Sequence, residues 1–169
     1  MAHSATDALR ANRAAVSWVS RDNLHCTMRF LGEVDDSIVG RARDALRQAA
    51  AGHACFGAAL GGFGAFPTAR RARVLWMGML QGAEPMRLLA ASIETALLER
   101  GFEPADQEFE PHLTVGRVRT SGDWTTALIE APTVEIRFQV RRLQLVQSTL
   151  GPGGSRYERL AELELGASS

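Results

Sequence analysis

Residues 23–30 (Asn-Leu-His-Cys-Thr-Met-Arg-Phe) and residues 110–117 (Glu-Pro-His-Leu-Thr-Val-Gly-Arg) carry the same short pattern, a histidine followed two positions later by a threonine. The alternation of side chains predicts a β-strand over Leu24–Leu31 and another over His112–Val118. Because residues two apart share one face of a strand, each histidine is expected to point the same way as its threonine. A motif repeated in two halves of a chain predicts pseudo-twofold symmetry, with both copies facing one cleft.

Other helices and strands are predicted around these two stretches. Asp35 and Asp36 favour the start of a helix that runs to about Ala51, and a second helix over 86–100 ends at Gly101. Strands are expected over residues 56–66, 73–80, 133–140, 142–149 and 157–165, with a short helix within 121–130.

This order of elements predicts an α+β fold. We expect a bilobal, pseudo-twofold duplicated unit in which antiparallel sheets are flanked by helices around a central cleft. Residues 1–169 would form one domain of two pseudo-symmetric lobes, the first containing His25 and the second His112.

Composition excludes several classes of protein. The net charge is zero, which argues against a general binder of long nucleic acid. All 19 basic side chains are arginine, so a phosphate-binding loop with its lysine, Schiff-base chemistry and ligation through a lysine adenylate are excluded. No apolar run reaches the ~18 residues needed to span a bilayer. Two isolated cysteines, Cys26 and Cys55, indicate reduced core residues of a cytoplasmic protein.

The scattered histidines predict no metal site, because zinc ligands normally cluster at short spacings. The doubled motif instead predicts phosphoryl chemistry without metal or cofactor. One imidazole would remove a proton from an attacking water while the other donates a proton to the departing ribose oxygen. His3 and His53 lie outside the motif and are expected to have no catalytic role.

Four stretches of the sequence resemble the two-histidine phosphoesterase superfamily, and within it the RNA 2′,3′-cyclic phosphodiesterases, also called 2′-5′ RNA ligases. They are NLHCTMRFLGEVDD (residues 23–36), GGFGAFPTARRARVLWMGM (61–79), FEPHLTVGRVR (109–119) and LVQSTLGPGGSRYERL (145–160). The resemblance implies an enzyme in which water opens a 2′,3′-cyclic phosphate at an RNA 3′ end or on a small nucleotide, leaving a 2′-phosphate. Run backward, the same chemistry joins a 2′-5′ bond without ATP.

The resemblance also implies roles for individual residues. His25 would be the proton donor and His112 the proton acceptor, and Thr27 and Thr114 would hold phosphate oxygens. Arg117 would contact the substrate, and Phe30, its counterpart in the first copy, would be an apolar neighbour of a base. Strict alternation places these last two residues on the face opposite their histidines, so their roles rest on the resemblance alone.

The sequence departs from the family in two places. The usual first strand is missing from the opening MAHSATDALRANR, so an unpaired sheet edge is expected, and with it a homodimer or a weakly stable monomer. Gln147 stands where relatives often have glutamate, beside the residue matched by Ser148, and the lost charge predicts a shift in substrate preference.

Alternatives to an enzyme remain open at this point. A nucleotide- or RNA-binding module with little catalysis is the first, a purely structural domain the second, and metal-dependent hydrolysis comes last for want of ligands. Trp76 is expected in the core, and packing is favoured over base stacking for Trp18 and Trp124. The sequence assigns no role to Tyr157 and decides neither the physiological substrate nor the importance of ligation in the cell.

Overall fold

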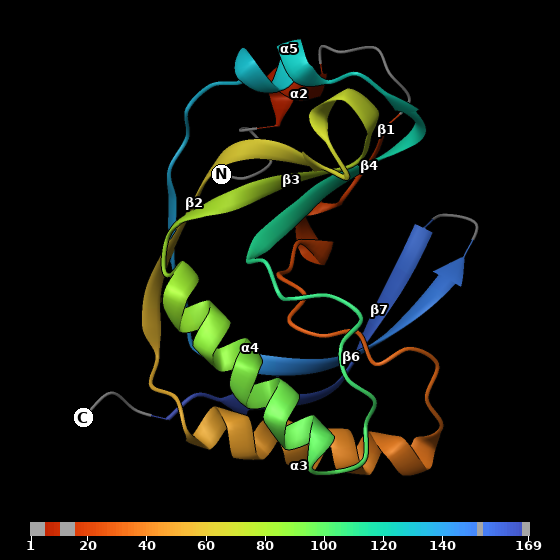
Figure 1. Cartoon of the computed structure of the whole chain (residues 1–169), viewed down its shortest axis with the longest axis vertical. Helices are drawn as coiled ribbons and strands as arrows, with labels where there is room; N and C mark the ends of the chain where they lie inside the picture. Colours follow the sequence, from red (N-terminus) through yellow and green to blue (C-terminus); the bar gives the residue numbers. More distant parts are fainter. Residues whose placement is uncertain (1–5, 11–15, 152–153, 167–169) are drawn as a thin grey trace. The chain divides into compact units, whose positions relative to one another are not determined.

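The computed structural model of the chain describes residues 6–10, 16–151 and 154–166 (Figure 1). Its helices are α2 (Asp7–Arg10), α3 (Asp36–Ala51), α4 (Ala83–Leu98) and α5 (Thr125–Ile129), with 3₁₀ turns η1 (Arg21–Asn23) and η2 (Ala69–Arg71). The strands are β1 (Val16–Trp18), β2 (Phe56–Phe66), β3 (Ala72–Gln81), β4 (His112–Gly122), β5 (Ile136–Val140), β6 (Arg142–Gly151) and β7 (Gly154–Glu164). The predicted α+β class is confirmed, and the pairs β1–β4, β2–β3, β3–β4 and β6–β7 are antiparallel.

The chain divides into two compact units, each assembled from three separate segments. Unit 1 comprises Met1–Thr27, Gly57–Ala83 and Pro111–Phe138, and unit 2 comprises Met28–Phe56, Glu84–Glu110 and Gln139–Ser169. Both His25 and His112 fall in unit 1, and the predicted division into two pseudo-symmetric lobes with one histidine in each stays a prediction. The chain passes between the units several times, so neither unit corresponds to one half of the sequence.

Unit 1 is built on a sheet whose described strands run in the order β1-β4-β3-β2-β5. Leu75 and Met77 of β3 and Leu113 and Val115 of β4 are buried on one face of this sheet. They form the sheet side of a core, the unit 1 cluster, whose other buried members are Leu9, Leu60, Ala72, Val118 and Trp124. Removing such side chains from water is the main source of stability for the unit.

The segment 24–31 was predicted to be a strand, and this prediction is wrong, because the structure assigns it no regular secondary structure. The predicted alternation is nevertheless real over its first residues. Leu24 and Cys26 pack against the unit 1 cluster, whereas Met28 and Leu31 pack against the core of unit 2. The partly buried side chains of this short segment therefore belong to two different cores, and the segment, which leads from unit 1 into unit 2, joins no β-ladder.

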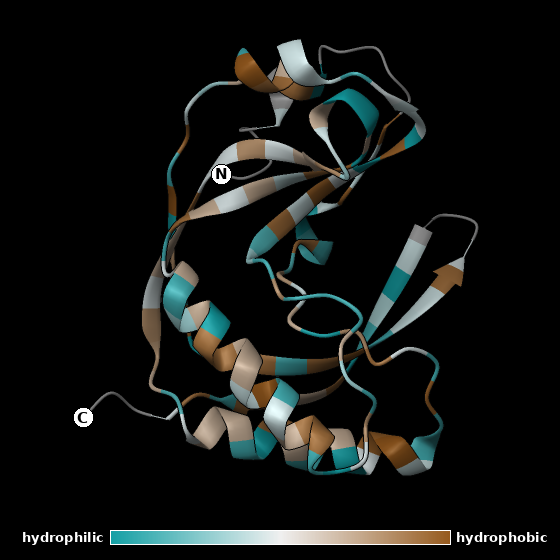
Figure 2. Ribbon diagram, viewed as in Figure 1, coloured by the Kyte–Doolittle hydropathy of each residue, from teal (hydrophilic) through white to brown (hydrophobic). Residues whose placement is uncertain are grey.

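Unit 2 consists of helices α3 and α4 and the hairpin β6–β7. Asp35 caps α3 by accepting hydrogen bonds from the backbone N–H groups of Ser37 (2.9 Å) and Ile38 (3.2 Å). Figure 2 shows hydrophobic and hydrophilic residues alternating along α3, as a one-sided helix requires. Helix α4 ends at Leu98, two residues before the predicted Arg100, and the chain then turns at Gly101, whose φ of 78° lets the Phe102 N–H reach the Leu97 carbonyl oxygen.

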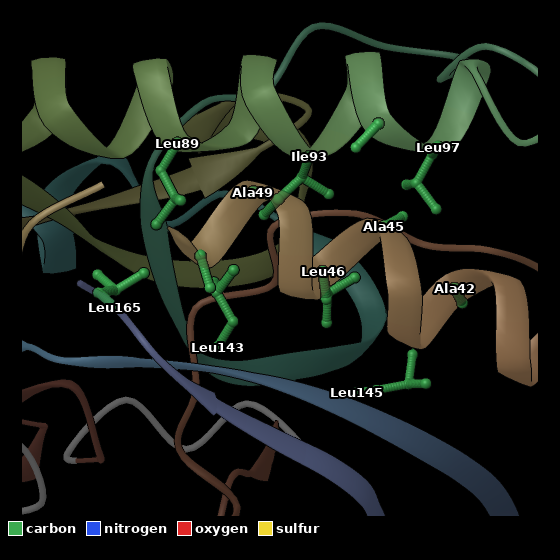
Figure 3. Close-up of a cluster of buried hydrophobic side chains, with 12 residues drawn as sticks. Ala42, Ala45, Leu46, Ala49, Leu89, Ile93, Leu97, Leu143, Leu145 and Leu165 are labelled. Carbon is green, nitrogen blue, oxygen red and sulfur yellow. The ribbon is translucent and has the colours of Figure 1, made fainter. Parts of the chain in front are cut away.

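The core of unit 2 is formed where these elements meet. Leu89, Ile93 and Leu97 of α4 point towards α3, as Figure 3 shows. The other buried members are Ala96 of α4, Ala42, Ala45, Leu46, Ala49 and Ala50 of α3, Leu143 and Leu145 of β6, and Leu165, which follows β7. The small alanines of α3 allow close approach of the neighbouring elements, and Leu46 is the large buried side chain that this helix adds to the core.

None of the helices in the described parts of the chain is both long and apolar enough to cross a membrane.

The packing of α4 predicts opposite outcomes for two adjacent leucines. Leu89 is 0% exposed and Leu88 is 54% exposed. Leu89→Ala leaves a cavity in the unit 2 core and should lower the free energy of unfolding by about 2–5 kcal/mol. Leu88→Ala is the matched control and should change it by no more than about 0.5 kcal/mol, measured by urea denaturation. Equal losses in the two variants would contradict the orientation of the helix.

The buried thiol of Cys26 predicts a loss of stability in alkali. Burial raises the pKa of this thiol from 9.0 to about 11. Above pH ~9 the unfolded chain therefore releases the Cys26 proton while the folded chain retains it, so stability falls as pH rises. Between about pH 8 and about pH 10.5 the loss from this group should reach about 2 kcal/mol.

The chain suits this measurement because it has no lysine and a single tyrosine to titrate in the same range. The comparison is the urea unfolding free energy of wild type and Cys26→Ala at the two pH values. The variant should lose less stability than wild type over this interval. Equal losses in both proteins would show that the Cys26 thiol does not cause the dependence.

Candidate active site

The two histidine motifs are anchored on the same hydrophobic core. In the first motif Leu24 and Cys26, on either side of His25, pack against the unit 1 cluster. In the second motif Leu113 and Val115 are members of that cluster, 6% and 2% exposed. The polar residues of the second motif, His112 and Thr114, are half-buried. In both motifs, the apolar residues next to the histidine and threonine pack on the same core. This packing anchors the segment that carries each histidine.

The imidazole of His25 is held by its own backbone. The side chain is exposed, and its Nδ1 lies 2.7 Å from the carbonyl oxygen of Asn23. A carbonyl oxygen can only accept a hydrogen bond, so Nδ1 carries the proton and donates it. This contact fixes the orientation of the ring and the tautomer of the imidazole.

Strand β4 contains a β-bulge immediately after its histidine motif. Thr114 pairs with Trp76 of β3, but the next pair along the ladder joins Gly116 to Leu75, so Val115 is an extra residue in β4. Consistent with this, both Val115 and Gly116 are buried, although strict alternation would expose one of them. A bulge of this kind reverses the faces to which the following residues point.

The bulge brings Arg117 to the face that carries the second histidine motif. Before the bulge, His112 and Thr114 lie on the face away from the core. After it, Gly116 and Val118 face the core, while Arg117 and Arg119 are exposed. The expectation that Arg117 lies opposite its histidine is therefore wrong, because strict alternation does not allow for an inserted residue. His112, Thr114 and Arg117 share one face of the unit 1 sheet.

Two aromatic rings that sequence reasoning did not assign to the site lie against His112. The ring of Phe66 meets the imidazole edge to face, with centroids 5.1 Å apart, and the Trp76 ring lies at 6.3 Å. Trp76 was expected in the core, but it is half-buried on the same face as His112 and Thr114. Its indole N–H is buried and has no hydrogen-bond partner among the described residues.

The other residues considered from the sequence belong to unit 2 or to the core of unit 1. Phe30 belongs to unit 2 and is 71% exposed. Gln147 and Tyr157 are on the unit 2 hairpin, where Gln147 pairs with Glu158 and Ser148 pairs with Tyr157. Trp124 is buried in the unit 1 cluster and Trp18 packs against that cluster, so both expectations of packing are confirmed.

His53 and Arg29 form hydrogen bonds with other side chains or with the backbone. His53 Nε2 lies 2.7 Å from Ser92 Oγ, and His3 is outside the described residues. Arg29 Nε donates to Glu94 (2.8 Å) and its Nη2 donates to the Glu103 carbonyl oxygen (2.6 Å). Arg29 thus attaches the end of the first motif to α4 and to the loop that leads to the second. Among the described residues no three His, Cys, Asp or Glu side chains gather as metal ligands would.

Comparisons with known proteins identify the family of the chain. A family model described as the 2′-5′ RNA ligase superfamily matches residues 2–152. The RNA 2′,3′-cyclic phosphodiesterase of Aeropyrum pernix is 32% identical over 166 residues, covering 96% of this chain and 93% of the relative. The enzyme of the same name from Methanothermobacter thermautotrophicus is 34% identical over 155 residues, covering 89% and 83%.

Solved structures show the same fold. A protein of Thermus thermophilus superposes with a TM-score of 0.84 at 26% identity, over 99% of this chain and 91% of that one. Escherichia coli LigT in complex with 3′-AMP gives a TM-score of 0.71 at 25% identity, over 98% and 92%. On the doubled histidine motif, the family match and these relatives together, the chain belongs to the 2′-5′ RNA ligase superfamily.

Proposed function

We propose that this protein hydrolyses 2′,3′-cyclic phosphates at RNA 3′ ends, or on small cyclic nucleotides, to 2′-phosphates without a metal or cofactor. The observation that carries the proposal is the pair of histidine motifs anchored on one core, with His112, Thr114 and Arg117 on one sheet face. The relatives named RNA 2′,3′-cyclic phosphodiesterase support the same reaction.

In the proposed reaction His112 removes a proton from water as the water oxygen attacks phosphorus. The bond between phosphorus and the ribose 3′ oxygen breaks, and His25 gives that oxygen a proton from Nε2, the ring nitrogen that does not face the Asn23 carbonyl oxygen. Thr27 and Thr114 donate hydrogen bonds to the non-bridging oxygens as negative charge moves onto them. Each proton transfer typically contributes about 10²–10⁴-fold to the rate.

Charge and ring contacts would complete the recognition of the substrate. Arg117 is exposed and can form charge-assisted hydrogen bonds to the phosphate. The predicted role of Phe30, an apolar contact with a base of the substrate, stays a prediction. With a 5′-hydroxyl RNA end in place of water, the same groups would form a 2′-5′ phosphodiester, because each step is reversible.

The cellular compartment, the oligomeric state and the symmetry of the chain belong to the proposal as well. Both cysteines are free thiols, which favours a reducing cytoplasm. Self-association through an unpaired sheet edge stays a prediction, and so does the pseudo-twofold relation between two lobes. In the described residues β1 pairs with only Val118, Arg117 and Gly116 of the much longer β4.

Replacement of either motif histidine should abolish most of the activity. His25→Gln and His112→Gln remove the proton donor and acceptor, so kcat on 2′,3′-cyclic AMP should fall by about 10²–10⁴-fold in each. His53→Gln is the matched control, because His53 bonds to Ser92 and has no part in the reaction, and it should keep wild-type kcat. Product formation is followed by chromatography that separates 2′-AMP from 3′-AMP.

The same assay distinguishes the proposed reaction from metal-dependent hydrolysis and from nucleotide binding without catalysis. Wild-type rates should persist with a chelator present, and a requirement for added metal would contradict the proposal. Tight nucleotide binding with no product would make the protein a binding module. A 3′-phosphate product would show that the other phosphorus–oxygen bond breaks.

The position of Arg117 beyond the bulge predicts that its replacement raises KM, whereas replacement of Arg119 does not. Arg117→Ala removes a charge-assisted hydrogen bond to the phosphate and should raise KM by roughly 10–100-fold. Arg119 is equally exposed on the same strand but lies farther from His112. Arg119→Ala should therefore leave KM within about twofold of wild type, as expected for a surface residue. A larger effect from Arg119 than from Arg117 would mean that the phosphate does not bind beside the second motif.

A further inference from the structure

We infer that Phe66 and Trp76 are positioning residues for His112, holding its imidazole at the angle the reaction needs. The inference rests on the proposed function, in which His112 is the proton acceptor. Its structural basis is a cluster of three rings on one face of the unit 1 sheet. Phe66 and Trp76 lie 5.2 Å apart, Phe66 and His112 5.1 Å apart, and Trp76 and His112 6.3 Å apart.

The sheet register explains how residues from three strands meet. Phe66 of β2 pairs with Val74, Trp76 of β3 pairs with Thr114, and His112 of β4 pairs with Gly78. These pairs lie in successive rows of the same face, so Trp76 is a diagonal neighbour of both other rings. Side chains at such diagonal positions are within reach when at least one of them is aromatic.

Two glycines give the Trp76 ring the space it occupies. A Cβ on Gly64 would lie 2.2 Å from Cζ2 and 2.4 Å from Cη2 of the indole, and one on Gly78 would lie 3.2 Å from Cζ3. The indole therefore lies over backbone that carries no side chain. From this position it contacts Phe66, and the Phe66 ring in turn meets the imidazole at an interplanar angle of 80°.

Edge-to-face contact restricts rotation of the imidazole about its side-chain bonds. The restriction matters because His112 must present one nitrogen to a water in line with the bond that breaks. A shift of about 1 Å in such a group can cost about 10²-fold in rate. His25 is oriented differently, through the hydrogen bond from Nδ1 to the Asn23 carbonyl oxygen.

The decisive experiment compares two phenylalanines on opposite faces of β2. Phe66→Leu removes the ring against His112 and should lower kcat on 2′,3′-cyclic AMP by about tenfold, with KM within about twofold. Phe66→Tyr keeps the ring and should restore kcat. Phe63 packs against the unit 1 cluster, so Phe63→Leu is the matched control and should leave kcat unchanged even if it lowers stability.

A spectroscopic measurement reports the ring contact without relying on activity. The carbon-bound protons of the His112 imidazole should show ring-current shifts relative to those of exposed His25. These shifts should largely disappear in Phe66→Leu and persist in Phe63→Leu. Resonances are assigned with the His25→Gln and His112→Gln variants.

A second variant keeps the test decisive if Phe66→Leu does not fold. Gly64→Ala touches neither His112 nor the substrate, but its new methyl group must displace the indole. It should lower kcat and move the His112 resonances, whereas Gly40→Ala, which meets nothing within 4 Å, should do neither.

Each outcome bears on one of the two proposals. Unchanged kcat and unchanged His112 resonances in the folded Phe66 and Gly64 variants would overturn the positioning role, even with His112→Gln inactive. A rise in KM at constant kcat would make Phe66 a substrate contact and would overturn it too. Full activity in His112→Gln would instead defeat the proposed function itself.

Discussion

Strand β4 carries one extra residue, Val115, at the point where it pairs with Leu75 and Trp76 of β3, and the side chains of the candidate site depend on this mismatch. Because Val115 is the extra residue, the strand directs Leu113, Val115, Gly116 and Val118 to the core. The polar residues on either side of the bulge then share the other face, as His112, Thr114 and Arg117 do. A regular strand would have separated the imidazole from the guanidinium by the thickness of the sheet.

The core that supports this face also supports the first motif. Leu24 and Cys26 pack against the cluster to which Leu113 and Val115 belong, although the two motifs are far apart in the sequence. Burial holds Cys26 in its neutral form, with the pKa of its thiol raised to about 11, so this cysteine acts as an apolar anchor and is a poor nucleophile. Both histidine motifs are thereby carried by segments that packing holds in place, as a precise site requires.

The sequence predicted the elements whose signals are local. Asp35 caps α3 where expected and Gly101 turns the chain shortly after α4, because a capping carboxylate and a residue with positive φ act on their immediate neighbours. The class of chemistry was also predictable, because the repeated histidine motif is visible without any coordinates. Neither conclusion depends on how distant segments pair.

Features that depend on pairing between strands were not predictable. The alternation in 24–31 suggested a strand, but it does not reveal that Met28 and Leu31 bury in a different core from Leu24. The stretch His112–Val118 gave no sign of its bulge, since the extra residue is defined only by the partner strand β3. The glycines at 64 and 78 were the available signal that the Trp76 ring lies over backbone that carries no side chain.

The central claim is that His25 and His112 act together on one phosphate group, and a double variant tests it most directly. The measurement is the rate of 2′,3′-cyclic AMP hydrolysis by His25→Ala, His112→Ala and the protein carrying both changes. When two groups act as a unit in one transition state, removing the second costs little once the first is gone. The hydrolysis rate of the double variant should therefore be about the same as that of the slower single variant. If the two losses multiply instead, the histidines contribute independently and the account of a cooperating pair is contradicted.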